Sequence, residues 1–437
     1  MKFYTSVLPY RGRLLVRGVD KDGAQKKYRI NYKPSLFVPV GKETKYKTLD
    51  GRYVERIKFD SMPEATKWVN EYKNVTNFEY FGNTRHQYPF IADEFKGKID
   101  WDMNKIKLLT IDIECESENG FPSPEKADQP LICITVKDHT TKKIIVFGMG
   151  NFVNDREDVQ YINCVTETGL VETFTKFWVE YNPDIITGWN VKFFDIPYLM
   201  NRFRYLMGDD WLNQFSPWGV VEQRSAAVLF ASREQQVWNI MGVDTLDYLD
   251  LYRKFTFVRR ESYKLDYIGE VELGQNKLDN PYDTFKEFYS NDYQRFVEYN
   301  IQDVELVDKL EDKLQLIALF LTMAYEAKVN YQDVFGQVRI WDCIIYHHLR
   351  SKNIVPPAVQ ESKTSSGYEG AYVKDPVVGF HDWVCSFDLN SLYPHLIMQY
   401  NISPETMVGF EPNRVNVENM LNQKSDLSDL DNRTITP

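Results

Sequence analysis

The sequence predicts a multidomain protein of the mixed α+β and α/β classes. Its 437 residues exceed what one ordinary hydrophobic core organises, so roughly two to four domains are expected. Residues 1 to about 105 open with alternating strands, whereas from Lys107 onward short apolar strands alternate with helical patterns. The second pattern predicts a mixed sheet with helices on both faces.

Composition and charge narrow the class of protein. The chain carries 52 basic and 63 acidic residues, for a net charge of −11. This balance argues against a nucleic-acid-binding protein with a uniformly basic surface. It is compatible with an enzyme whose carboxylates hold metal ions while a partner supplies the basic surface that binds nucleic acid. The five cysteines are scattered and odd in number, which is typical of a reducing compartment and disfavours a disulfide framework or a zinc site.

The apolar segments of the chain do not predict a membrane protein. The first residues, MKFYTSVLPYRGR, lack the apolar core of a signal peptide. The best apolar run, LQLIALFLTMAY from Leu314, is too short and too interrupted to cross a bilayer. We therefore expect a cytoplasmic protein with no membrane partner.

The N-terminal part predicts a small α+β domain over residues 1–105. The segments FYTSVLPY, RLLVRGVD and KYRINY are predicted strands, with a turn at Lys21-Asp22-Gly23. The segment MPEATKWVNEY, from Met62, predicts a surface helix with proline in its first turn. Residues 316–358 are expected to join this domain.

The middle part predicts a second domain over residues 106–315. Its predicted strands are KLLTIDIE, LICITVKD, KIIVFGM and PDIITGW, and LVETFTKFWVEY is a predicted helix. A surface turn is expected at 208–210, a protruding hairpin at 230–244, alternating on either side of Asn239, and a long helix from Tyr293 to about Lys328. Residues 359–437 form the third predicted unit, after a linker at 356–370 and with a polar tail at its end.

The segment LLTIDIECE places two acids in a buried-looking strand. Because side chains alternate along a strand, Asp112 and Glu114 share one face while Ile111 and Ile113 share the other. Two acids on one face are costly unless a cation neutralises them. The alternative is an edge strand with a solvated face.

Two further segments carry acids at defined spacings. In DIITGWNVKFFDIPYL an apolar strand leads into a loop with Asn190 and then Asp195, which precedes a proline at a predicted helix start. The alternative role of Asp195 is an ordinary N-cap. In YNIQDVELV, Tyr299 and Asp303 lie four apart and share a helix face, the alternative being a helical tyrosine over an exposed acid.

Together these segments predict a carboxylate metal centre. Four acids on three segments can converge on two divalent ions about 3.5–4 Å apart, an arrangement that hydrolyses phosphodiesters. Hard oxygen ligands favour Mg²⁺ or Mn²⁺. The hydroxyl of Tyr299 is expected to orient the attacking water.

A separate stretch, CSFDLNSLYPHLIMQY, predicts a strand that carries Asp388 to a tight turn and then a helix. The backbone amides from Asn390 to Leu392, at the helix start, are natural donors to phosphate oxygens. The alternative is an ordinary helix cap after a buried strand.

The three acidic segments resemble the exonuclease motifs of the DnaQ-like 3′→5′ proofreading domain in family B DNA polymerases, especially those of large tailed phages. The resemblance implies an RNase H-like fold in which the four acids hold two metal ions. It also implies that Phe121 wedges against the terminal bases, that Lys277 lies near the scissile phosphate, and that the predicted hairpin separates strands. The motif residues that carry this resemblance are Asp112, Glu114, Asn190, Asp195, Tyr299 and Asp303.

SFDLNSLYP is similar to the first palm motif of the same family. The resemblance implies that Asp388 is one of two aspartates that bind two polymerase metal ions, and that Tyr393 excludes a 2′-hydroxyl. It also implies contacts with the triphosphate of a dNTP from Leu389, Asn390, Ser391 and Leu392. GYEGAYV, from Gly367, resembles the family's linker between exonuclease and palm, and ISPET, from Ile402, continues the phage-like pattern.

No fingers helix, second palm motif or basic thumb follows Asp388 in the sequence. We therefore interpret the chain as the N-terminal subunit of a split DNA polymerase that proofreads DNA 3′→5′. A second chain would supply the fingers, the remaining palm and the thumb, and with them any contact with a sliding clamp. The alternatives are an autonomous exonuclease with a palm remnant, or an RNA-binding regulator of its own message acting through residues 1–105.

Overall fold

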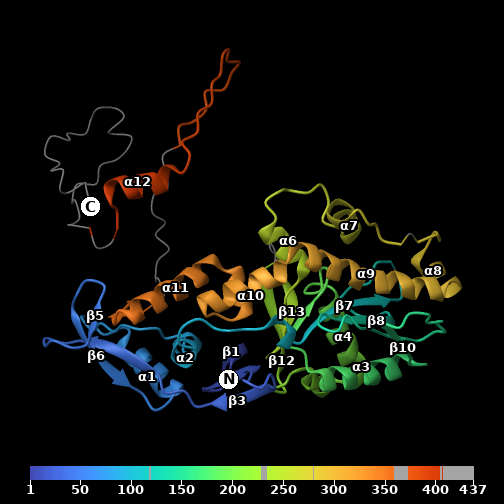
Figure 1. Cartoon of the computed structure of the whole chain (residues 1–437), viewed down its shortest axis with the longest axis horizontal. Coiled ribbons are helices and arrows are strands. Elements are labelled where there is room, and N and C mark those ends of the chain that lie inside the picture. Colours follow the sequence, from blue (N-terminus) through green and yellow to red (C-terminus); the bar gives the residue numbers. More distant parts are fainter. Residues whose placement is uncertain (118–119, 228–233, 279, 359–372, 404–405, 407–437) are drawn as a thin grey trace.

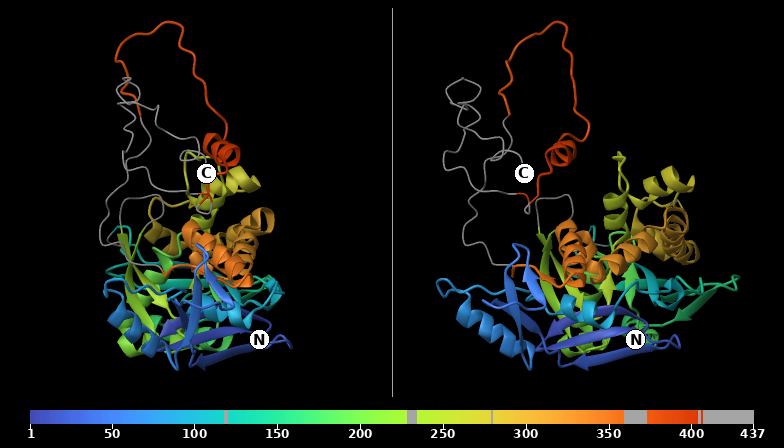
Figure 2. Two further views of the ribbon diagram at one scale, coloured as in Figure 1. Left: turned by 90° about the vertical axis from the view of Figure 1, so that its left-hand side faces the viewer. Right: turned by 60° about the vertical axis from the view of Figure 1, so that its left-hand side comes forward.

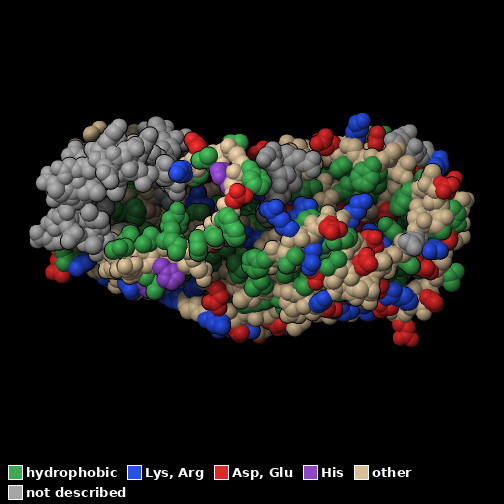
Figure 3. Space-filling view, turned by 90° about the horizontal axis from the view of Figure 1, so that it is seen from above, with side chains coloured by type: hydrophobic (Ala, Val, Ile, Leu, Met, Phe, Trp, Pro, Cys, Tyr) green, Lys and Arg blue, Asp and Glu red, His purple; other side chains and the backbone are tan. Residues whose placement is uncertain are grey.

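The computed structural model describes residues 1–117, 120–227, 234–278, 280–358, 373–403 and 406. They form an elongated body with small N-terminal sheets at one end and a large sheet at the other (Figure 1). Residues 373–403 stand off from this body in every ribbon view (Figures 1 and 2). Acidic, basic and hydrophobic side chains are interspersed over the face seen in Figure 3. The predicted mixed α and β multidomain class is confirmed.

Two small sheets and two helices make up the N-terminal region. The first is an antiparallel sheet of β1, β2 and β3, and the second has the order β15-β5-β6-β4. In the second sheet β15 pairs in parallel with β5, so a segment far along the chain returns to this region. The bounds are β1 Phe3–Tyr10, β2 Arg13–Val19, β3 Gln25–Ile30, β4 Ser35–Pro39, β5 Tyr46–Thr48, β6 Tyr53–Lys58, β15 Ile354–Val355, α1 Met62–Tyr72 and α2 Gln87–Glu94.

A six-stranded mixed sheet organises the middle of the chain, with the order β10-β9-β8-β7-β11-β14. Strand β7 lies inside the sheet, antiparallel to β8 and parallel to β11. Separately, β12 and β13 form a two-stranded hairpin. The bounds are β7 Leu108–Cys115, β8 Leu131–Asp138, β9 Ile144–Gly148, β10 Val159–Asn163, β11 Ile185–Thr187, β12 Val221–Ala227, β13 Glu234–Ile240 and β14 Asp244–Thr245.

Helices pack on both faces of this sheet, as predicted. Along β8, Ile134 enters a core that also contains Leu170 of α3 and Leu199 of α4, whereas its neighbour Cys133 enters a core with Phe288 of α8 and residues of α9. Alternation along one strand therefore serves two cores. The bounds are α3 Glu167–Tyr181, α4 Asp195–Met207, α5 Asp209–Leu212, α6 Tyr248–Phe255, α7 Leu265–Leu273, α8 Phe285–Asn291 and α9 Tyr293–Leu314, with short 3₁₀ helices at Met103–Lys105, Asn213–Phe215 and Tyr331–Phe335.

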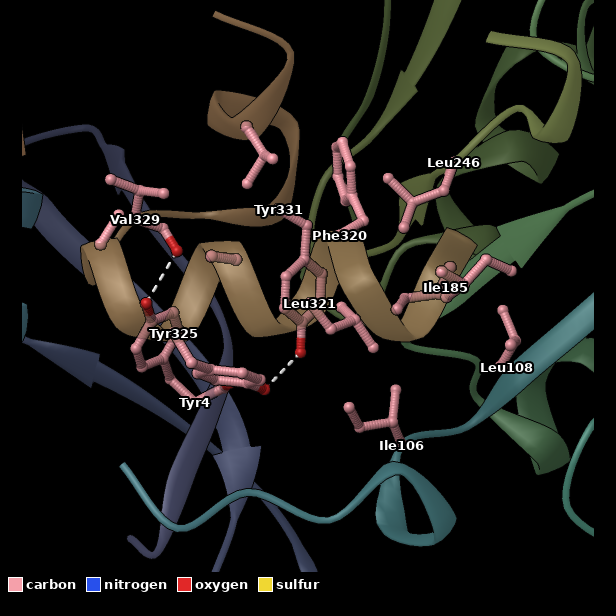
Figure 4. Close-up of a cluster of buried hydrophobic side chains, with 14 of the residues drawn as sticks. Tyr4, Ile106, Leu108, Ile185, Leu246, Phe320, Leu321, Tyr325, Val329 and Tyr331 are labelled. Carbon is pink, nitrogen blue, oxygen red and sulfur yellow. Dashed lines mark hydrogen bonds between the residues drawn. The ribbon is translucent and has the colours of Figure 1, made fainter. Parts of the chain in front are cut away.

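The long helix predicted from Tyr293 to Lys328 is wrong as one element. It is broken at Gln315, whose φ of 54° is left-handed, into α9 and α10 (Leu316–Ala327). The break lets α10 turn onto the N-terminal strands, where the hydroxyl of Tyr4 donates to the Val329 carbonyl at 2.7 Å (Figure 4). A uniform helical pattern hides this break because both halves are helical.

The structure also differs from the predictions for the hairpin at 230–244 and the turn at 208–210. Asn239 lies inside β13, paired with Glu222, so the hairpin is formed by 221–240 and not by segments on either side of Asn239. Its connection, residues 228–233, lies outside the described residues. The turn predicted at 208–210 is the start of the short helix α5, which Gly208 precedes.

The strand predicted before Asp388 is not formed. Described residues 373–391 contain no strand, and the regular structure there begins with α12 (Leu392–Tyr400). A strand needs a neighbour for its backbone groups, and no described residue pairs with this segment. Most of the predicted linker at 356–370, most of the motif at 367–373, part of ISPET and the whole polar tail lie outside the described residues.

Helix α11 (Gln337–Ser351) completes the body beside α10. None of the helices within the described ranges is long and apolar enough to cross a membrane.

Candidate metal centre

Strand β7 carries two acids on one face, as its alternation predicts. Ile111 and Ile113 are buried in the core with α3 and α4, while Asp112 and Glu114 are partly buried on the opposite side. Helix α9 packs against β7 on that side and brings a third acid. The carboxylates of Asp112, Glu114 and Asp303 offer ligand atoms that all lie within 4.8 Å of one another.

Asp195 reaches the same strand from another direction. Strand β11 pairs with β7, and the chain then turns at Gly188, where an added Cβ would lie 2.5 Å from the Ile111 carbonyl oxygen. Asp195 begins α4, is buried, and accepts a hydrogen bond from the Ile113 amide at 3.1 Å. The N-cap residue is Phe194 and makes no side-chain capping bond, so the alternative role of Asp195 as a cap is not observed.

Asp247 fixes the loop between β11 and α4, and the sequence reasoning missed it. It is buried and accepts the amides of Asn190, Lys192 and Leu249, each at 3.0 Å. Asn190 is left-handed, with φ of 66°, and contributes its backbone to this loop. Asp247 is also the N-cap of α6, but nothing in the sequence showed that it would hold a loop 55 residues away.

Asn300 was also missed, although it follows Tyr299 directly. It is fully buried, and its Nδ2 donates to Asp112 Oδ2 at 2.5 Å, while Cys133 Sγ donates to its Oδ1 at 3.3 Å. The amide therefore orients the Asp112 carboxylate from α9. Its place beside a motif residue on the same helix was the only signal that the sequence offered.

The electrostatics of the cluster follow from burial and mutual repulsion. Loss of hydration, and then the charge of Asp303, raise the pKa of Glu114 to about 8. Burial and the charges of Asp303, Asp195 and Glu114 raise the pKa of Asp112 well above its ordinary value. Burial raises the pKa of Asp195 to about 7 although the Ile113 amide opposes it. Buried acids that repel one another in this way cannot all stay ionised without a compensating cation.

Lys277 lies in the centre and supplies part of that charge. Its ammonium pairs with Asp303 and donates to the Tyr299 hydroxyl at 3.4 Å. Burial alone would lower its pKa, but the charges of Asp303, Tyr299 and Asp112 raise it above its ordinary value. The pKa of Asp303 is nevertheless raised, because burial outweighs the lysine. One ammonium is therefore not enough for the cluster.

The donor set fits a divalent metal ion. All its ligand atoms are carboxylate oxygens, the type that Mg²⁺ and Mn²⁺ prefer. Asp303 Oδ1 is buried and has no hydrogen-bond partner among the described residues, and an ion would satisfy it. Asp112, Glu114 and Asp303, with Asp195 beside them, would hold the ion.

Phe121 lies at the edge of this centre. Its side chain is 86% exposed, and its ring lies 5.4 Å from that of Phe194, the residue before Asp195. An exposed ring held beside the acids is available to a ligand. Its role as a wedge stays a prediction.

The residues predicted for the second site are not brought to this centre. Asp388 is exposed and forms no hydrogen bond or ion pair in the part of the chain that the structure describes. Ser391 is left-handed, with φ of 53°, and α12 begins after it. Leu389, Asn390, Leu392 and Tyr393 are all exposed.

Two sequence families match the chain. Residues 66–268 match the family described as DNA polymerase family B, exonuclease domain, and residues 332–434 match DNA polymerase family B. Asp112, Glu114 and Asp195 fall in the first range, and Asp388 in the second, whereas Tyr299 and Asp303 lie between the two.

Curated relatives agree with these matches. The chain is 34% identical over 437 residues to the DNA-directed DNA polymerase of Escherichia phage RB69, and 31% identical over 434 residues to that of Enterobacteria phage T4. Each alignment covers 93% of this chain and 48% of the relative, so the chain spans about half their length. It is also 29% identical, over 69% of its length and 29% of the relative's, to the DNA polymerase delta catalytic subunit of Caenorhabditis elegans. The chain therefore belongs to the family B DNA polymerases and carries their exonuclease domain and the start of their palm.

Proposed function

We propose that this chain hydrolyses DNA from the 3′ end with two divalent ions, Mg²⁺ or Mn²⁺, at the acid cluster. The observation that carries the proposal is the convergence of Asp112, Glu114 and Asp303 within 4.8 Å, with Asp195 tied to the same strand. When bound, such ions make hydroxide from water and neutralise charge on the leaving oxygen.

The chain's own side chains have separate tasks in this reaction. The Tyr299 hydroxyl accepts a hydrogen bond from Lys277, which leaves its own proton free to donate to the attacking water and orient it. The ammonium of Lys277 stabilises negative charge on the scissile phosphate. Asn300 and the Ile113 amide hold Asp112 and Asp195 in place. Asn190 and Phe121 bind the terminal nucleotides.

The test is the degradation of a 5′-labelled single-stranded oligonucleotide with Mg²⁺. Wild-type chain is expected to give a ladder that shortens from the 3′ end, and EDTA is expected to abolish it. Asp155→Ala, an exposed acid of the same region, is the matched control for Asp112→Ala. Products that shorten from the 5′ end, or hydrolysis that persists in excess EDTA, would overturn the proposal.

We propose in addition that Asp388 and Tyr393 contribute to a polymerase site that a second chain completes. The supporting observation lies in residues 373–403, which we call the palm segment: its exposed apolar surface includes Phe380, Trp383 and Phe387. Exposed apolar patches of this kind mark interaction surfaces. Helix α11 adds an exposed stripe at one-turn spacing, formed by Val338, Trp341 and Ile345.

Primer extension tests this second part. The pure chain is expected to extend no primer, and detectable template-directed extension by it would refute the need for a partner. Adding a polypeptide that carries the remaining half of the relatives' length is expected to restore extension, with the clamp contacted through that chain. Asp388→Asn should then abolish extension and leave 3′ hydrolysis unchanged. Because two of the relatives come from bacteriophages, we infer that the reaction takes place in the cytoplasm of a host bacterium.

A further inference from the structure

A basic segment lies between α6 and α7. Residues 253–264, RKFTFVRRESYK, contain five basic residues and one acidic residue in a chain whose net charge is −11. We call this segment the basic loop. Lys and Arg side chains gather near the middle of the face shown in Figure 3, with hydrophobic side chains beside them. The charge of this loop is opposite to that of the acid cluster and of the chain as a whole.

The basic loop is fastened to the rim of the acid cluster on two sides. Trp189, the residue before Asn190, donates its indole N–H to the Tyr263 carbonyl at 3.0 Å. Two residues beyond the loop, Asp266 accepts the Lys277 amide at 2.8 Å, and the Lys277 side chain reaches Asp303. The loop therefore spans from one acidic segment to the neighbourhood of another.

Two arginines of the basic loop make contacts within the protein that stabilise the loop. Arg260 pairs with Glu272 at 2.7 Å and donates to the Tyr252 hydroxyl at 2.9 Å. Arg253 lies over the Tyr263 ring at 4.5 Å. These contacts hold the loop in a defined shape at the cluster's edge.

Two other cations of the loop are left for a ligand. The side chains of Arg259 and Lys264 are exposed and make no ion pair or hydrogen bond within the described ranges. Beside Arg259, Phe257 is 99% exposed and Val258 is also exposed. A fully exposed phenylalanine next to free cations combines a stacking surface with phosphate contacts, which is how single-stranded DNA is bound.

We propose that the basic loop binds the single-stranded DNA whose 3′ end enters the acid cluster. Phe257 stacks on a base, while Arg259 and Lys264 contact backbone phosphates. The inference rests on the proposed function for the identity of the substrate. It also gives the acid cluster what it lacks, because a carboxylate centre repels the phosphates that it must hydrolyse and nearby cations offset that repulsion.

The test measures binding without hydrolysis. In an Asp112→Ala background, fluorescence anisotropy of a 5′-labelled oligothymidylate is followed in Mg²⁺ at several salt concentrations. Phe257→Ala is expected to weaken binding about 10-fold, in the range for loss of one stacked base. Arg259→Gln and Lys264→Gln are each expected to reduce the slope of log K against log salt by about 0.7, which a general structural defect would not do.

Matched controls lie on the same domain but away from the basic loop. Tyr205→Ala removes an exposed aromatic ring from α4, and Lys176→Gln removes an exposed cation from α3. Both controls are expected to keep the parent affinity and salt slope. Because Phe257 is exposed, its loss does not threaten folding.

The outcomes separate the two proposals. If the wild type degrades DNA but the loop variants bind like the parent, the loop inference is overturned and the proposed function stands. If the loop variants bind more weakly but the wild type degrades nothing, the proposed function fails and the loop remains a DNA-binding site. If the parent binds no oligonucleotide at all, the loop inference fails.

Discussion

The acid cluster and the palm segment look alike in sequence and differ in structure. Both place an aspartate among apolar residues, as TIDIE around Asp112 and SFDLN around Asp388. Asp112 lies in a strand paired on both sides, across from α9. Asp388 lies in an exposed segment between Phe387 and Leu389, which are 92% and 69% exposed.

The difference teaches that a carboxylate motif becomes a site through its neighbours. At the cluster, an amide from α9 and a backbone N–H from β7 orient two of the acids. At the palm segment no described residue performs this task. The first arrangement is pre-organised for binding a metal ion, whereas Asp388 has no such support from the residues that the structure describes.

The largest expected effect tests whether Asp112 and Asp388 differ in their contribution to 3′ hydrolysis. Asp112→Ala should reduce 3′ hydrolysis at least about 10³-fold, because a metal ligand supplies several kcal/mol to the transition state. Asp388→Ala should leave hydrolysis unchanged. Rates on single-stranded DNA measure both variants.

A stability measurement shows whether the loss of activity in Asp112→Ala comes from misfolding. In EDTA, Asp112→Ala should unfold cooperatively and near the denaturant concentration of the wild type, because the relief of repulsion among the acids offsets the loss of the acceptor of the Asn300 amide. A variant with normal turnover, or Asp388→Ala with none, would show that the two aspartates have been assigned to the wrong sites.

The next largest effect concerns the free energy of unfolding and depends only on residues near the acid cluster. Asp308, on α9, is buried and accepts charge-assisted contacts from Lys137 at 2.8 Å and Lys142 at 2.7 Å. Asp308→Asn should lower the free energy of unfolding by about 3 kcal/mol, because it strands a largely buried lysine.

The pH dependence of this variant follows from the same contacts. Burial alone would raise the pKa of Asp308, but hydrogen bonds from His139, Lys137 and Lys142 hold it well below its ordinary value. A carboxylate whose folded-state pKa is depressed stabilises the fold above the unfolded pKa of about 4, and this stabilisation is lost progressively as the pH falls from there through the depressed folded-state pKa. The free energies of unfolding of wild type and variant should therefore approach each other between pH 7 and pH 3 without meeting there, and a constant difference would contradict the ion-pair explanation.

Local periodicity could predict the parts of the site that one element defines. Alternation along β7 predicted that Asp112 and Glu114 share a face, and four-residue spacing predicted that Tyr299 and Asp303 do. The structure shows the first two acids together and brings Asp303 to them. These signals depend only on strand and helix geometry, which the sequence specifies directly.

Tertiary contacts decided what the sequence could not predict. Asp195 before a proline was equally suited to cap α4, and only its bond to the Ile113 amide distinguishes the two roles. No pattern in the sequence marks the roles of Asn300 and Asp247 at the site, because the partners that define these roles lie far away in the chain. The break at Gln315 and the unpaired palm segment have the same cause, because each depends on what packs nearby.

A smaller effect tests how the cluster is oriented. Asn300→Ala should weaken Mn²⁺ binding about 10–100-fold, the usual cost of losing a group that orients a metal ligand. Electron paramagnetic resonance of free Mn²⁺ measures this directly. Asn201→Ala is a matched control, since it removes a buried amide that bonds to the Pro124 carbonyl and not to an acid of the cluster. Equal Mn²⁺ affinity of the Asn300 variant and the wild type would reduce Asn300 to a packing residue.

The smallest expected effect is the change in the free energy of unfolding when an apolar side chain of the palm segment is removed. Phe387→Ser should change the free energy of unfolding of the isolated chain by less than about 0.5 kcal/mol, because the ring is exposed. Phe296→Ala, which removes a fully buried ring of α9, should instead cost about 3–5 kcal/mol. Denaturant unfolding measures both variants.

The exposed ring of Phe387 can also be used to test where a second chain binds. If a second chain completes the palm, Phe387→Ser should weaken its association by about 1.5–3 kcal/mol, the value of burying one such side chain. Titration of the completing polypeptide against wild type and variant gives this difference. A substitution that is silent in the isolated chain and costly in the pair would locate the missing interface at the segment that carries Asp388. One that is silent in both would place the contact elsewhere, and the stripe of Val338, Trp341 and Ile345 on α11 is then the surface to change next.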